Sequence, residues 1–183
     1  MLPAPAPPAN PGPLWTGQPI VLVGLMGVGK STVGRRLAAR LRLPFVDADH
    51  EIEVAAAMTI SEIFEKYGEA YFRDGERRVI ARLMDGVPKV IATGGGAFIN
   101  DQTRALMLRD ALVIWLDADT GVLADRVRRR DTRPLLRGRD ARAVLDELAA
   151  KRNPIYAEAH LRIASQKAPH DATVHAILQA IGR

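Results

Sequence analysis

A glycine-rich segment near the start of the chain reads Gly24-Leu25-Met26-Gly27-Val28-Gly29-Lys30-Ser31-Thr32. It fits the phosphate-binding pattern G-x-x-x-x-G-K-[ST]. The apolar, β-branched run 20–23 before it predicts a buried parallel strand. The run 31–41 after it has apolar residues on one helical face and arginines on the other, which predicts a helix. Strand, glycine loop and helix form the context that this pattern requires.

Each residue type in this segment has a chemical reason to face a phosphate. Glycines let the loop adopt conformations closed to other residues, so that backbone N–H groups can approach phosphate oxygens. The helix that follows points its positive end at them. Lys30 can reach the β- and γ-phosphates, and the Ser31 hydroxyl can ligate Mg²⁺. The segment therefore predicts a site for a nucleoside triphosphate, formed by Gly27, Val28, Gly29, Lys30, Ser31 and Thr32.

The composition limits the remaining classes of function. The 183 residues suit one domain, and no apolar run approaches the roughly 18–20 residues that span a membrane. The chain has no cysteine, which excludes disulfides, thiol catalysis and cysteine-bound zinc. Arginine supplies 21 of the 26 basic residues, while aromatic residues make up only 5%, too few for base-stacking platforms. The net charge of +5 therefore favours small anionic ligands over nucleic acid.

The first 18 residues differ in composition from the rest of the chain. They are rich in proline, alanine and glycine and carry no charged side chain. This predicts a flexible leader over 1–18, with Trp15 exposed, followed by a single domain over 19–183. The leader lacks the basic start and apolar core of a secretory signal, so we expect a cytoplasmic protein.

Acidic residues, rather than histidines, are the candidate ligands of this chain. Asp47 and Asp49 follow a predicted strand at 43–46. Ligands gather at the carboxyl ends of parallel strands, so either acid is a candidate site residue, although capping of the next helix explains each equally well. The four histidines form no metal-ligand pattern, and we expect them to be surface or filler residues: His50, His160, His170 and His175.

A helical insertion is predicted between the second and third strands, with substrate-binding helices at about 49–84. A capping box at 59–62 starts one helix, Gly68 ends it, and another helix follows over 69–84. The second helix carries Arg73 and Glu76, which either face a substrate or pair with each other on a solvated surface. Small-substrate kinases of this architecture place their acceptor site in such an insertion.

Three consecutive glycines, Gly94-Gly95-Gly96, follow a predicted strand at 89–93. A plain tight turn needs fewer, so this run indicates close approach of the backbone to a ligand or to another chain segment. Further strands at 112–116 and 161–164 alternate with helices at about 100–109, 140–159 and 171–181. This alternation predicts an α/β fold with a five-stranded parallel sheet flanked by helices.

Eight arginines lie between residues 126 and 142. A mobile lid at about 128–140 would let them close over a nucleotide, exclude water and supply positive charge. An ordinary solvated surface explains most of them as well. Arg133, which is fixed beside Pro134, is the arginine for which a function is favoured.

Together these motifs resemble those of the shikimate kinases, over about residues 19–183. The resemblance rests on an ordered set: Asp47/Asp49, Phe72-Arg73 with Glu76, Thr93-Gly94-Gly95-Gly96, Arg133-Pro134-Leu135-Leu136, and Lys151-Arg152-x-Pro-x-Tyr ending at Tyr156. It implies a P-loop kinase with a nucleoside-monophosphate-kinase-like fold, an acceptor-binding helical insertion and a mobile lid. It also implies transfer of the γ-phosphoryl of ATP to the 3-hydroxyl of shikimate, in the route to chorismate and the aromatic amino acids.

The resemblance also implies a role for each matching residue. Lys30, Asp49 and Arg133 would be catalytic, with Asp49 orienting the acceptor hydroxyl and the two cations stabilising the transferring phosphoryl group. Arg133 and Gln166 would complete the nucleotide site. The substrate would be bound by Asp49, Arg73, Gly95, Gly96 and Arg152, with the two arginines on its carboxylate. Mg²⁺ would be held by Ser31 and, through water, by Asp47.

The partners implied are the small molecules ATP and shikimate, with no nucleic acid and no membrane, and we expect a monomer.

Three other readings stay open. A kinase of the same architecture could phosphorylate gluconate or a nucleoside monophosphate, because paired arginines suit a carboxylate or a phosphate equally. A non-catalytic nucleotide-binding homologue would be expected to lose Lys30, Asp49 or Arg133, and all three are present. A nucleic-acid binder is the most distant alternative.

Overall fold

The structure, a computed structural model, describes residues 14–129, 140–165 and 169–183. Its centre is a parallel sheet of five strands in the order β2-β3-β1-β4-β5. The strands are β1 (Ile20–Val23), β2 (Phe45–Asp47), β3 (Val90–Ala92), β4 (Leu112–Asp117) and β5 (Leu161–Ala164). The predicted five-stranded parallel α/β sheet is therefore confirmed.

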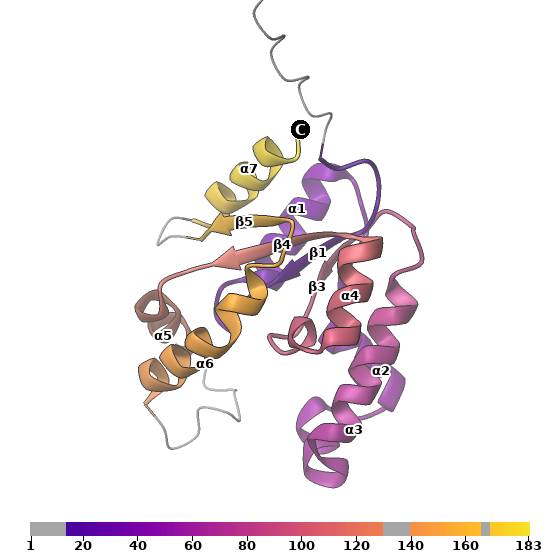
Figure 1. Ribbon diagram of the computed structural model, residues 1–183, viewed down its shortest axis with the longest axis vertical. Coiled ribbons are helices and arrows are strands. Elements are labelled where there is room, and N and C mark those ends of the chain that lie inside the picture. Colours follow the sequence, from indigo (N-terminus) through magenta and orange to yellow (C-terminus); the bar gives the residue numbers. More distant parts are fainter. Residues whose placement is uncertain (1–13, 130–139, 166–168) are drawn as a thin grey trace, which may run out of the picture.

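Helices cover both faces of the sheet, with α1 behind it and α4 and α6 in front in the view of Figure 1. The helices are α1 (Lys30–Leu41), α2 (Ala48–Ala56), α3 (Ile60–Leu83), α4 (Asp101–Asp110), α5 (Thr120–Arg128), α6 (Ala141–Tyr156) and α7 (His170–Ala180), with a 3₁₀ turn η1 (Ala97–Ile99). Because helices cover both faces of the sheet, all four residues of the central strand β1 are buried. This burial explains its continuous apolar sequence. None of the described helices is long and apolar enough to cross a membrane.

Helices α2 and α3 form an arm that extends away from the sheet (Figure 1). The capping box at its start is present: Thr59 Oγ1 accepts from the Glu62 N–H at 3.2 Å, and Glu62 Oε2 accepts from the Thr59 N–H at 2.7 Å. Gly68 interrupts α3 with φ 82° and ψ 177°, so the two predicted helices follow one another across a kink. The kink lets the second half of α3 return to the sheet, where Phe72 and Ile80 are buried.

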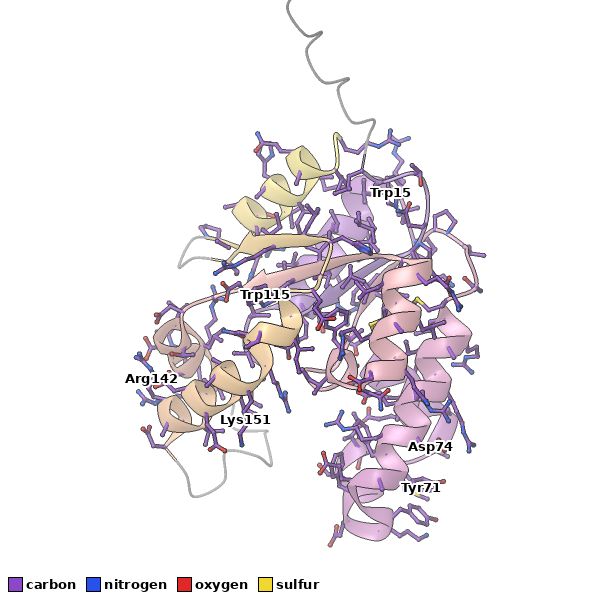
Figure 2. The ribbon with its side chains drawn as sticks, viewed as in Figure 1. Trp15, Tyr71, Asp74, Trp115, Arg142 and Lys151 are labelled. Atoms are coloured by element: carbon purple, nitrogen blue, oxygen red, sulfur yellow. The ribbon has the colours of Figure 1, made fainter. Side chains whose placement is uncertain are left out.

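Trp15 belongs to the folded domain, and the prediction that it is exposed is wrong. Its side chain is only 8% exposed and packs with the core. The side chain of Trp15 is labelled in Figure 2. Its indole N–H donates to the Gln18 carbonyl at 2.7 Å, and the Arg183 guanidinium lies 5.3 Å from the ring centroid. Composition gave the wrong prediction because burial of one large aromatic ring is favourable even in a segment rich in proline. Residues 1–13 lie outside the described residues.

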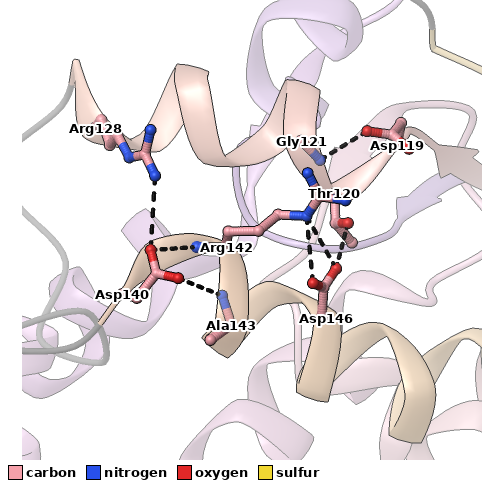
Figure 3. Close-up of polar contacts among 8 residues, drawn as sticks. All are labelled: Asp119, Thr120, Gly121, Arg128, Asp140, Arg142, Ala143 and Asp146. Carbon is pink, nitrogen blue, oxygen red and sulfur yellow. Dashed lines mark hydrogen bonds and ion pairs between the residues drawn. The ribbon is translucent and has the colours of Figure 1, made fainter.

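Helices α5 and α6 flank the predicted lid, and polar contacts join them at both ends (Figure 3). Asp119 caps α5 and Asp140 caps α6, while Arg128 lies 3.6 Å from Asp140. At the other end, Asp146 contacts the Arg142 guanidinium and the Thr120 hydroxyl. The first arginines of the run therefore belong to a helix. Residues 130–139, with Arg133 among them, lie outside the described residues.

Candidate active site

The glycine-rich segment forms a loop between β1 and α1, as predicted. Gly29 caps α1 with φ 94° and ψ 28°, a left-handed conformation that glycine adopts without strain. At Gly24 an added Cβ would lie 2.5 Å from the Leu116 carbonyl oxygen, so a side chain has no room there. Lys30 Nζ donates to the carbonyls of Gly24 at 2.7 Å and Leu25 at 3.1 Å, which keeps the ammonium within the loop.

The two acids after β2 lie beside this loop. The Ser31 hydroxyl donates to Asp47 Oδ2 at 2.8 Å, while Asp47 Oδ1 accepts from the Asp49 N–H at 3.1 Å and caps α2. Asp47 therefore caps a helix, one of the two roles left open from the sequence, and it also lines a cleft beside the loop. Asp49 lies in the first turn of α2 and, like Asp47, lines this cleft.

One cleft of about 280 Å³ brings most of the predicted residues together. Its lining includes Gly27, Gly29, Lys30, Ser31, Thr32, Asp47, Asp49 and Gly95. Val28 is fully buried and does not line the cleft. Arg133 and Gln166 lie outside the described residues.

The cleft is also lined by Arg126, Val127 and Arg129 from the arginine-rich segment, and by His170. His170, expected to be a surface or filler residue, is partly buried and packs against the loop. It begins α7, and its ring lies so close to the loop that a Cβ added to Gly29 would be 2.6 Å from its Cε1. The available signal was topological, because residues following the end of β5 must reach the ligand edge of the sheet.

The three glycines after β3 each lie against a different predicted side chain. An added Cβ would be 2.9 Å from Asp49 Oδ1 at Gly94, 3.2 Å from Arg152 Nη1 at Gly95, and 2.5 Å from Arg73 Nη1 at Gly96. The glycine run therefore makes room for one carboxylate and two guanidinium groups, contributed by three different helices. Of the alternatives left open, close approach to other chain segments is the one that the structure displays.

Arg73 and Glu76 do not form a solvated surface pair. Arg73 Nη1 lies 2.7 Å from Glu76 Oε2, and Glu76 is only 3% exposed. Burial raises the pKa of the Glu76 carboxyl, against the lowering effect of the Arg73 charge and hydrogen bond; the nearby Asp49 adds to the rise. The buried Glu76 carboxyl holds the Arg73 guanidinium in one orientation. A guanidinium held in this way can bind a planar anion with two hydrogen bonds.

The Ser31 hydroxyl and the Asp47 carboxylate suit Mg²⁺. Both are hard oxygen ligands, they are 2.8 Å apart, and they lie beside the loop expected to hold phosphates. Among the described residues there is no cluster of three histidine or acidic side chains that could hold a metal by itself. This agrees with the usual manner of Mg²⁺ binding, in which one or two protein oxygens act together with water and substrate phosphates.

A parallel sheet with a loop of the phosphate-binding pattern after its central strand, and a charged cleft beside that loop, is the arrangement of a P-loop kinase. Comparisons with known proteins narrow this class. The shikimate kinase family model matches residues 26–182, and the chain therefore belongs to the shikimate kinase family.

Individual relatives agree with this assignment. The chain is 59% identical to a shikimate kinase of Bradyrhizobium diazoefficiens over 162 residues, covering 88% of this chain and 78% of that protein. It is 60% identical to one of Caulobacter vibrioides over 162 residues, covering 88% and 81%. Among solved structures, shikimate kinase from Acinetobacter baumannii in complex with shikimate superposes with a TM-score of 0.86 at 39% identity, covering 91% of this chain and 93% of that one. A gluconokinase from Sinorhizobium meliloti has a TM-score of 0.59 at 19% identity over 91% of this chain and 93% of its own, and shares the fold alone.

Proposed function

We propose that this protein transfers the γ-phosphoryl group of ATP to the 3-hydroxyl of shikimate, giving shikimate 3-phosphate and ADP for aromatic amino acid biosynthesis. The observation that carries the proposal is the packing of Asp49, Arg73 and Arg152 against the three glycines, beside the phosphate loop. Shikimate has one carboxylate and three hydroxyls. Two guanidinium groups and one carboxylate match that set of acceptors and donors.

The nucleotide half of the site is formed by residues 27–32. The backbone N–H groups of the loop and the start of α1 would surround the phosphates, with Lys30 on the β- and γ-oxygens. Nucleotide binding would move the ammonium from the carbonyls of Gly24 and Leu25 to the phosphates. Mg²⁺, when bound by Ser31 and through water by Asp47, would neutralise developing charge. Arg133 and Gln166, outside the described residues, complete this half in the proposal.

The acceptor half holds the substrate by its carboxylate and directs one hydroxyl at the nucleotide. Arg73 and Arg152 would bind the carboxylate, and Gly95 and Gly96 would let the ring approach the backbone. Asp49 would accept a hydrogen bond from the 3-hydroxyl and take its proton as the oxygen attacks. Positioning and charge stabilisation, rather than covalent chemistry, would then supply the acceleration.

The experiment is a coupled assay of ADP release with Mg-ATP and shikimate, run beside gluconate, CMP and AMP. We expect rapid release with shikimate only. Release with a different acceptor would keep the nucleotide site and overturn the substrate. No turnover with any of the four, while ATP still binds, would favour the non-catalytic reading.

A pair of variants locates the carboxylate. Arg73→Lys replaces a planar fork by a point charge and should raise KM for shikimate, with KM for ATP unchanged. Arg78→Lys is the matched control, because Arg78 is on the same helix and its side chain is 74% exposed. An unchanged KM for shikimate in Arg73→Lys would mean that the carboxylate is bound elsewhere.

We also propose that the enzyme is a cytoplasmic monomer without a nucleic-acid partner. The low aromatic content of 5% and the exposed salt bridges on α3, α4 and α6 support this. Size-exclusion chromatography with light scattering tests the monomer. Binding to DNA or RNA at micromolar protein, with a steep dependence on salt, would contradict the proposed absence of a nucleic-acid partner.

A further inference from the structure

Tyr156, the last residue of α6, is a polar side chain in an apolar setting. It is fully buried, with its ring centroid 6.4 Å from that of Phe98 and 6.0 Å from that of Trp115. A phenylalanine would satisfy this packing without burying a hydroxyl, and burial of a hydroxyl costs free energy unless it is hydrogen-bonded. The hydroxyl therefore needs an explanation of its own.

The hydroxyl joins two parts of the proposed acceptor site. It donates to the Gly95 carbonyl oxygen, and its lone pairs can accept from the nearby Arg152 guanidinium. A phenol can do both at once, because it donates one hydrogen and accepts another, whereas a guanidinium only donates. Arg152 precedes Tyr156 by four residues on α6, so both side chains lie on one face of the helix.

The two contacts reinforce each other. A Cβ at Gly95 would lie 3.2 Å from Arg152 Nη1, so the guanidinium and the glycine backbone pack directly against one another. Each donor of a guanidinium has a fixed direction in the plane of the group. A donor directed at the hydroxyl would therefore set the direction of the others. The bond to the Gly95 carbonyl likewise fixes the plane of the peptide between Gly95 and Gly96.

We propose that Tyr156 is a positioning residue for the acceptor carboxylate, whose hydroxyl orients the Arg152 guanidinium and the Gly95 peptide together. The inference rests on the proposed function of Arg152. Burial raises the pKa of the Tyr156 hydroxyl to about 12, so the group keeps its proton and remains a donor at neutral pH. Tyr156 touches no reacting atom and acts through its two partners.

The test is Tyr156→Phe, which keeps the ring and removes only the hydroxyl. Tyr71→Phe is the matched control, because Tyr71 lies on α3 and is 55% exposed. We expect Tyr156→Phe to raise KM for shikimate about tenfold, the size of one lost hydrogen bond, and to leave KM for ATP unchanged. The control should change neither constant.

A double-mutant cycle shows whether the hydroxyl acts through the arginine. In the Arg152→Lys background, Tyr156→Phe should raise KM for shikimate by less than about twofold, because the group it orients is already gone. Equal fold-changes in both backgrounds would overturn the coupling. An unchanged KM for shikimate in Tyr156→Phe, whatever its melting temperature, would show a merely structural hydroxyl. An unchanged KM in Arg152→Lys alone would instead refute the proposed carboxylate site.

A measurement on the intact side chain covers the case in which Tyr156→Phe does not fold. With Tyr67 and Tyr71 replaced by phenylalanine, 3-fluorotyrosine incorporation labels Tyr156 alone among the three tyrosines of the chain. Its ¹⁹F resonance should shift on addition of shikimate, and the shift should be lost in Arg152→Lys. A resonance unmoved by saturating shikimate would overturn the proposal.

Discussion

Gly96→Ala is a steric test of the acceptor site that adds one methyl group and changes no charge. The backbone at Gly96 has φ −96° and ψ −12°, which alanine adopts freely, so the substitution does not strain the chain. The new Cβ would lie 2.5 Å and 2.6 Å from the two Nη atoms of Arg73 and 2.7 Å from its Cζ. All three distances are well below van der Waals contact.

The clash is relieved when the guanidinium withdraws by about 1 Å, because the end of an arginine is easier to move than the backbone. Withdrawal disturbs the 2.7 Å contact with Glu76 and turns the fork away from the substrate. A displacement of about 1 Å in a positioning group costs up to about 100-fold, and one charge-assisted hydrogen bond is worth about 1.5–3 kcal/mol. We therefore expect KM for shikimate to rise about 10- to 100-fold, with KM for ATP unchanged.

The assay is steady-state ADP release with each substrate varied in turn. Gly75→Ala is the matched control: it is one residue from Glu76 on α3, and an added Cβ there meets nothing within 4 Å. This control should keep both KM values and gain stability from the better helix former. If Gly96→Ala also keeps the wild-type KM for shikimate, the position of Arg73 against Gly96 does not determine substrate binding.

Three further predictions concern the reaction and the stability of the fold. Asp49→Asn should keep the fold and lower kcat by about 10²–10⁴, the usual contribution of a general base, and wild-type turnover would remove Asp49 from the mechanism. Trp15→Ala should lower the free energy of unfolding in urea by about 3 kcal/mol at unchanged kcat, because a buried ring is lost. A change near zero would mean that Trp15 contributes nothing to the stability of the domain and belongs to the leader. Because burial raises the pKa of Glu76 in the folded state, its favourable contribution is complete below about pH 4 and is lost as the pH rises through the folded pKa. Urea unfolding of the wild type relative to Glu76→Gln should show this loss as the pH rises above about 4, and a difference that does not change with rising pH would contradict it.

Most of the fold could be predicted from local sequence patterns. The strand at 20–23, the loop and the helix starting at Lys30 could be predicted because apolar periodicity and glycine geometry are properties of neighbouring residues. Gly68 was recognisable for the same reason, since its conformation ends a helix whatever lies around it. The alternation of strands and helices predicted a parallel sheet, but not the order of its strands.

What could not be read from the sequence depends on distant partners. Trp15 is buried because the far end of the chain passes over it, and composition holds no trace of that contact. His170 reaches Gly29 only because α7 packs beside α1. The burial of Glu76, which distinguishes a site residue from a surface pair, likewise exists only once α3 returns to the sheet.

The contact between Trp15 and Arg183 brings the two ends of the domain together at one side of the sheet (Figure 1). A short flexible peptide can therefore bridge them, which makes the domain a candidate for circular permutation. The exposed turn at Gly86, where an added Cβ meets nothing within 4 Å, offers a place to open the chain. Synthesis of such a permuted gene would begin with β3 and finish with the arm. The ribosome would then deliver the three glycines and Arg152 before the phosphate loop and the arm, the reverse of the natural order, without altering a side chain of the site.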